Sequence, residues 1–309
     1  MVYAGELAGL ATAILWALTA IYFSQAGRLV GSFTVNKIRL LIAVVIYAGF
    51  SLVTTGNLYP QNINEQQLFW LGLSGIVGLI IGDGCGFKAL VMIGPRLATL
   101  IYASTPIMTT IIAWFFLDEK LSLMNVVGIV ITIGGLTWVV MERRFDSNNY
   151  FNLSKDHPDS GSLIKGVLLG LVAALGQATG LVLAKHGMFH AGGIVEPLPA
   201  SYVRMAVSLG GIWIITAVRG QLFTTMRTMK NSRALSLCAA GALFGPFLGV
   251  WMSLVAVKYI PAGLAATLNS TTPVMILPLV MLWHKERITL RATLGAIVTV
   301  CGVAIIFLY

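Results

Sequence analysis

The chain has 309 residues, of which 57% are hydrophobic and only 10% are charged, and its formal net charge is +9. A soluble domain carries about 25% charged residues, and its core could not bury this much apolar surface, whereas a bilayer can. Lys and Arg lie in short segments between apolar runs, which is typical of topology-setting residues and argues against a nucleic-acid binder. We expect an integral membrane protein that binds a small-molecule substrate and the lipid bilayer, and no nucleic acid.

Ten apolar segments approach the roughly 20 residues that a helix needs to cross the hydrocarbon core. They cover residues 5–26, 34–54, 68–90, 95–117, 123–141, 163–186, 199–218, 234–257, 261–283 and 291–309. The first segment has no positively charged residues before it, so we expect a spanning helix and not a signal peptide. In lipid, backbone polar groups must be satisfied within each segment, which predicts an all-α integral membrane fold with ten transmembrane helices.

The two halves of the chain are related by an offset of 167 residues. Thr105-Pro106 recurs as Thr272-Pro273, and Glu119 recurs as Glu286. The same offset pairs further residues: Gly78 with Gly245, Gly82 with Gly249, Ala98 with Ala265, Gly128 with Gly295, Thr132 with Thr299, and Gly135 with Gly302. This predicts a first five-helix repeat over 1–145, a polar linker over 146–162 and a second repeat over 163–309. An odd number of helices per repeat makes the repeats inverted, as in many secondary transporters.

Several motifs carry a resemblance to a known family. They are Leu15-Trp16-Ala17, Arg39, the stretch from Lys88-Ala89-Leu90 to Gly94-Pro95-Arg96, and the two helix-end signatures that run from Thr105-Pro106 to Asp118-Glu119-Lys120-Leu121 and from Thr272-Pro273 to Lys285-Glu286-Arg287-Ile288. Over essentially its whole length the chain resembles the drug/metabolite transporter superfamily, in its EamA-type branch of tandem repeats. The resemblance implies the fold more strongly than any substrate, since the family carries amino acids, nucleotide sugars, drugs and other metabolites.

The distribution of positive charge predicts the membrane orientation. Sixteen of the 20 Lys and Arg residues follow the odd-numbered helices, and Lys120, Lys185, Arg204 and Lys258 lie on the opposite side. Positive loops stay in the cytoplasm, so the bias places both termini outside it. The family resemblance implies the reverse, with both termini inside, although the segment 54–67 here lacks the basic residues that relatives carry after their second helix.

Asp83 is the most informative candidate residue, because it lies inside the third helix between Gly82 and Gly84. An ionisable group at this depth costs about 3 kcal/mol on insertion scales, so it should face a cavity or a cation. We expect it to contact substrate or couple a proton. The alternative is a structural residue that bonds nearby backbone or Lys88.

Two arginines occupy equivalent positions near the starts of the second and seventh helices, at an offset slightly different from 167 residues. Arg39 and Arg204 could bind a substrate carboxylate or phosphate. They could equally extend to the membrane interface or bond helix ends.

Polar and aromatic residues in four helices complete the candidate substrate site. These are Trp16 and Thr19, Gln177 and Thr179, Tyr102 and Ser104 with Thr105, and Asn269 and Thr271 with Ser270 and Thr272. Polar groups that precede a helix-breaking proline in both repeats predict a midplane cavity with free backbone carbonyls. The alternative is hydrogen bonding between helices.

Other motifs add little chemistry. Gly128, Gly135, Gly295 and Gly302 place small residues on one face of the fifth and tenth helices, which could pack internally or form a homodimer. His186 and His190 lack a third ligand, and the sequence has no ATP-binding or hydrolase motif. We therefore expect no metal, no cofactor and no enzymatic activity.

The sequence favours a secondary transporter of the inner (plasma) membrane. We expect export of a small metabolite, an amino acid or a related compound, by alternating access around a central cavity between the repeats. The alternative is a lipid-carrier flippase or a membrane enzyme that uses the same cavity.

Overall fold

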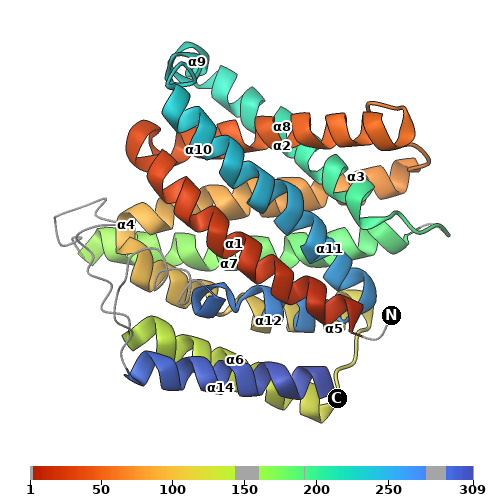
Figure 1. Cartoon of the computed structure of the whole chain (residues 1–309), viewed down its shortest axis with the longest axis vertical. Coiled ribbons are helices and arrows are strands. Elements are labelled where there is room, and N and C mark those ends of the chain that lie inside the picture. The colour runs from red at the N-terminus through yellow and green to blue at the C-terminus, as the bar shows by residue number, and fades with distance from the viewer. Residues whose placement is uncertain (1–2, 143–159, 191, 276–289, 309) are drawn as a thin grey trace.

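The computed structural model describes residues 3–142, 160–190, 192–275 and 290–308, and these residues form helices joined by short connections (Figure 1). The first half contains α1 (Ala4–Val30), α2 (Ser32–Thr55), α3 (Glu65–Gly75), η1 (Ile76–Gly82), α4 (Asp83–Tyr102), α5 (Thr105–Leu117) and α6 (Leu123–Glu142). The second half contains α7 (Ser160–Phe189), α8 (Pro197–Val218), α9 (Leu222–Thr228), α10 (Ser232–Ala242), η2 (Leu243–Gly249), α11 (Val250–Tyr259), α12 (Ala262–Asn269) and α14 (Leu290–Leu308).

The all-α membrane fold predicted from the sequence is confirmed. Eight helices in the described residues are long and apolar enough to cross a membrane, and they overlap the first eight predicted segments. The predicted division between the third and fourth segments at residues 91–94 is wrong, because α4 runs through it from Asp83 to Tyr102 and the chain turns at 103–104. The predicted ninth helix is described only as far as residue 275, and in the tenth the apolar stretch Thr293–Leu308 is shorter. The total of ten spanning helices therefore stays a prediction. Most of the predicted linker 146–162, and the second helix-end signature at 285–288, lie outside the described residues.

The offset of 167 residues recurs in the backbone. Two helices contain a seven-residue π-helical segment, η1 at Ile76–Gly82 and η2 at Leu243–Gly249, which are 167 residues apart. Two helices also break at turns, at residues 103–104 and 270–271, again 167 residues apart. Each break lies just before the Thr-Pro pair, because proline cannot donate the next helical hydrogen bond and favours a helix start.

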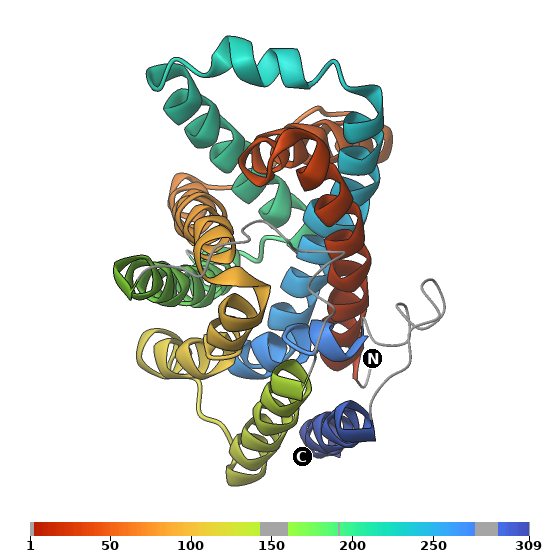
Figure 2. The ribbon, with the colours of Figure 1, turned by 90° about the vertical axis from the view of Figure 1, so that its left-hand side faces the viewer.

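Each half packs its first helix on the third helix of the other half. α1 lies along α10, η2 and α11, and α7 lies along α3, η1 and α4 (Figures 1 and 2). Glycines allow the second pair to approach closely, since a Cβ on Gly176 would lie 2.9 Å from the Cα of Gly82. The centre of the molecule is therefore built from both repeats.

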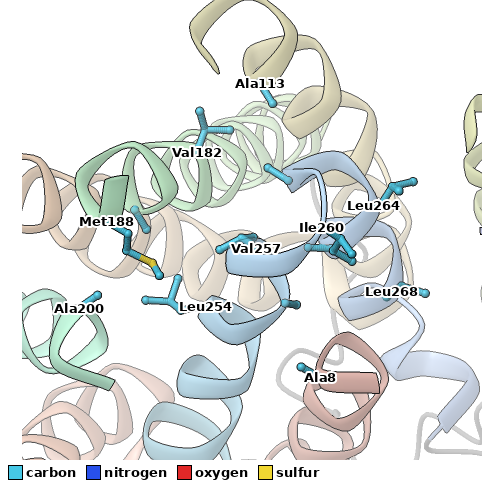
Figure 3. Packing of buried hydrophobic residues seen from close by; sticks show 14 of the residues in the cluster. Ala8, Ala113, Val182, Met188, Ala200, Leu254, Val257, Ile260, Leu264 and Leu268 are labelled. Carbon is cyan, nitrogen blue, oxygen red and sulfur yellow. The ribbon is translucent and has the colours of Figure 1, made fainter. Parts of the chain in front are cut away.

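A hydrophobic cluster closes the bundle at the end where both chain termini lie (Figure 1). Figure 3 shows residues from six helices that converge there: Ala8, Ala113, Val182, Met188, Ala200, Leu254, Val257, Ile260, Leu264 and Leu268. Most are alanine, valine or leucine with almost no exposed surface, so this end is tightly packed. We call these residues the terminal cluster.

α6 and α14 form a pair at one edge of the bundle (Figures 1 and 2). Their glycines face each other, since a Cβ on Gly135 would lie 2.5 Å from the backbone N of Thr299 and 2.8 Å from the carbonyl O of Gly295. The glycine face therefore packs internally, the first of the two alternatives given by the sequence. A homodimer through these helices stays a prediction, and it would have to use their outer faces.

Candidate substrate cavity

A cavity of about 390 Å³ lies between the two halves. α1, α2, η1, α4, α5 and α6 line it from the first half, and α7, α8, η2, α11 and α12 line it from the second. Its polar lining residues are Trp16, Thr19, Arg39, Asp83, Tyr102, Thr105, Gln177, Arg204, Ser253, Asn269, Ser270 and Thr272. The remaining lining is apolar or small, so the cavity suits a small amphipathic molecule.

Eight of the eleven predicted site residues line this cavity: Trp16, Thr19, Arg39, Asp83, Tyr102, Gln177, Arg204 and Asn269. The other three do not. Ser104 and Thr271 donate from their hydroxyls to the carbonyls of Ile101 (2.6 Å) and Leu268 (2.7 Å), so they satisfy backbone groups at the two helix breaks. Thr179 is two residues from Gln177, which is about 200° around the helix, and it faces away from the cavity.

Asp83 forms an ion pair with Arg39, and both side chains are largely buried, at 17% and 12% exposed. Gln177 Nε2 also donates to Asp83 Oδ1, and it donates to the carbonyl of Gly78 at 3.1 Å. The predicted alternative partner, Lys88, is exposed. Arg39, Asp83 and Gln177 thus connect α2, α4 and α7. The negative charge of Asp83 is neutralised by Arg39.

Arg39 is further held by neutral contacts. Its Nε donates to Asn36 Oδ1 at 2.7 Å, and its guanidinium lies over the ring of Phe87 at 5.5 Å. Planar guanidinium groups stack well on aromatic faces. Asn36, Phe87 and Asp83 therefore fix the orientation of the Arg39 guanidinium.

Arg204 differs from Arg39. Its side chain is buried, at 5% exposed, and its Nε has no hydrogen-bond partner. Among the described residues it forms no ion pair. Its Nη2 lies near Gly78, next to the Asp83 cluster but not bonded to it. Arg204 is thus within electrostatic reach of Asp83, but no carboxylate of the described residues is bonded to it.

Two further buried polar atoms in the lining lack a partner. Asn269 donates from Nδ2 to Ser253 Oγ at 2.9 Å, but its Oδ1 accepts nothing, and Thr105 Oγ1 is also unpaired. Buried polar atoms are nearly always hydrogen-bonded, so unpaired ones in a cavity mark places where a ligand can bind. Both residues flank the equivalent helix breaks.

A clamp of charged groups ties the closed end together. Lys185 Nζ lies 2.6 Å from Glu119 Oε1 and donates to the carbonyl of Ile260 at 2.7 Å. Glu119 Oε2 accepts from the backbone N of Ala262 at 2.7 Å. These contacts, which we call the terminal clamp, join the connection after α5, α7 and the turn between α11 and α12 beside the terminal cluster.

Some of the arrangement was not predicted. Ser253, Phe23 and Val250 line the cavity without having been named as site residues, and no local motif marks them. The Arg39–Asp83 pair was also missed, although one acid and one nearby cation within apolar helices are the signal that could have suggested it.

The two histidines belong to an aromatic cluster and not to the cavity. The rings of His186 and His190 lie 4.6 Å apart, and Trp70 contacts both. The described residues contain no group of three or more His, Cys, Asp or Glu side chains that could hold a metal ion.

Two related halves of membrane helices around a polar central cavity are the arrangement found in many secondary transporters. Comparison with known proteins agrees: residues 3–141 and 164–308 each match the EamA-like transporter family, and the chain belongs to that family. An uncharacterized transporter of Archaeoglobus fulgidus is 23% identical over 306 residues, covering 98% of this chain and 97% of that protein. A solved crystal structure superposes with a TM-score of 0.73 at 16% identity, covering 99% of this chain and 96% of the other, which shows that the fold is shared.

Proposed function

We propose that this protein is a secondary transporter of the inner (plasma) membrane that exports a small metabolite, an amino acid or a related compound. The observation that carries the proposal is the cavity of about 390 Å³ between the halves, with buried polar atoms that lack partners. The two repeats would alternate around this fixed site. Energy would come from an ion gradient or from exchange.

Alternating access requires one end of the cavity to be closed while the other is open. The terminal cluster and the terminal clamp block the end where both termini lie. A second pocket, of about 260 Å³, shares Asp83 and Tyr102 with the cavity and extends along α4 past Phe87 and Leu90. Release of the substrate at the end where the termini lie would require the terminal clamp to separate and this second pocket to close.

The distribution of positive charge predicts which side of the membrane the closed end faces. If the positive loops face the cytoplasm, the termini and the terminal clamp face away from it. The cavity would then be closed to the outside, which is the state in which an exporter loads its substrate. The π-helical segments η1 and η2, which lie where the halves meet, are suitable places for the helices to bend during exchange.

The test is counterflow in proteoliposomes that contain the purified protein. Vesicles loaded with one unlabelled amino acid, organic acid, nucleoside or sugar phosphate at a time should accumulate the same labelled compound for at least one class. Protein-free vesicles and the double variant N269L/S253A, which removes polar cavity groups, are the controls. If no compound moves faster through the protein than through empty vesicles, transport by this site is refuted.

A further inference from the structure

The two repeats contribute one arginine each to the cavity but only one acid. Arg39 on α2 and Arg204 on α8 occupy equivalent positions, and both line the cavity. Asp83 at the start of α4 neutralises Arg39. The residue 167 positions later, at the start of α11, is Val250, which also lines the cavity. The position that holds the carboxylate partner of Arg39 in the first repeat therefore holds an apolar valine in the second repeat.

Burial makes the missing carboxylate significant. Arg204 is 5% exposed, its Nε is unpaired, and no ion pair to it occurs in the described part of the chain. A buried charge without a partner is costly, and proteins retain one where a ligand or another protein group can compensate it. In this cavity the neighbouring acid, Asp83, is already bonded to Arg39 and Gln177.

The charges of the lining set the charge of the ligand. The described lining residues carry two positive charges, Arg39 and Arg204, and one negative charge, Asp83. One carboxylate beside Arg204 would balance this excess charge locally, whether the other end of the ligand carries an ammonium or a hydroxyl group. A carboxylate supplies one charge and two parallel acceptors that match the guanidinium fork. A phosphate monoester carries about −1.5 to −2 charges at neutral pH and would exceed the compensation available.

We propose that Arg204 binds the carboxylate of a small organic monocarboxylate, and that this group is what the transporter recognises. Asn269 Oδ1, the unpaired acceptor, is suited to a hydrogen-bond donor on the same ligand, such as an amino or hydroxyl group. Leu79, Leu136 and Leu181 provide apolar surface for the rest of the molecule. This inference rests on the proposed transport function, because it names the substrate class of the same site.

Binding can be measured apart from transport. The purified protein in detergent is titrated with L-alanine, L-leucine, L-phenylalanine and lactate, each beside its carboxamide, and with glycerol 3-phosphate, and binding is followed by calorimetry and melting temperature. At least one acid should bind at least about tenfold more tightly than its amide, because the charge-assisted pair with Arg204 is lost in the amide. R204Q should remove this preference, and R204K should keep part of it.

Position 250 offers a sharper test that leaves Arg204 in place. V250D reproduces in the second repeat the acid that Asp83 supplies in the first, so it should pair with Arg204 and abolish the preference for acid over amide. V250N has nearly the same size without the charge, and it should keep that preference whatever its absolute affinity. In the ligand-free protein, V250D should melt higher than V250N, and this difference should disappear in the R204Q background.

Each result decides the proposal. Equal binding of acids and amides, tighter binding of the phosphate ester, or no response to any carboxylate would overturn it. So would an acid preference that survives in V250D or in folded R204Q. If acids bind selectively through Arg204 but no counterflow occurs in proteoliposomes, the transport function is refuted. The assignment of Arg204 as a carboxylate-binding residue would still hold.

Discussion

Replacing Asp83 by asparagine isolates the charge of the Arg39–Asp83 pair. The substitution keeps the size of the side chain and an oxygen that can accept from Gln177 Nε2, but leaves the guanidinium of Arg39 without its carboxylate. Removing one partner of a buried ion pair costs about 3–5 kcal/mol. Since these side chains are 17% and 12% exposed, we expect the lower end, about 3 kcal/mol.

That loss is measurable as an apparent melting temperature in detergent. At about 2–4 °C per kcal/mol, D83N should melt about 6–12 °C lower than the unaltered protein. The double variant R39Q/D83N removes both charges and should recover part of the loss, so the two single effects should not add. A D83N protein with an unchanged melting temperature would refute the view that this pair holds α2 and α4 together, and strictly additive single effects would refute the direct coupling.

Three further predictions concern other parts of the molecule. K185M removes the cation of the terminal clamp, so the amide of Ala262, bonded to Glu119, should exchange hydrogen at least about tenfold faster by mass spectrometry. G135L should lower the yield of folded protein because its Cβ would lie 2.5 Å from the Thr299 backbone, whereas G134L, which meets nothing within 4 Å, should be tolerated. A fluorescent protein that matures only in the cytoplasm should stay dark when fused to the C-terminus, because the positive loops lie at the other end.

Each of these has a clear opposite result. Unchanged exchange at Ala262 would mean that Glu119 holds the turn without help from Lys185. Equal yields of G134L and G135L would mean that α6 and α14 do not meet through their glycines. Bright cells would place the C-terminus in the cytoplasm, as the family resemblance implies, and would reverse the assigned direction of the closed end.

The sequence predicted the helices and the repeat well because these depend on local composition and on self-similarity. Apolar length predicted the first eight spans, and the Thr-Pro pairs predicted where two helices break. A recurring proline has the same backbone consequence each time it occurs, so no tertiary information was needed.

The candidate site was less accessible to prediction, for reasons that particular residues make clear. The partner of Asp83 is 44 positions away and is chosen by how α2 packs, which composition does not encode. Thr179 was named because it is one of the few polar residues of its helix, yet the rotation of about 100° per residue turns it from the face that Gln177 uses. Ser104 and Thr271 lie at the predicted breaks, but their hydroxyls are taken by carbonyls that the breaks leave free.

The matched π-helical segments also carry information about the history of the chain. A π turn contains an extra residue relative to an α turn and is rare, so one such segment in a helix is already unusual. Here η1 and η2 cover seven residues each at the same place in the two repeats. Two independent insertions at one register are a poor explanation for this agreement. The simplest account is that the extra residue dates from a single ancestral repeat and that both copies kept it, although only the first copy carries an acid beside it, Asp83.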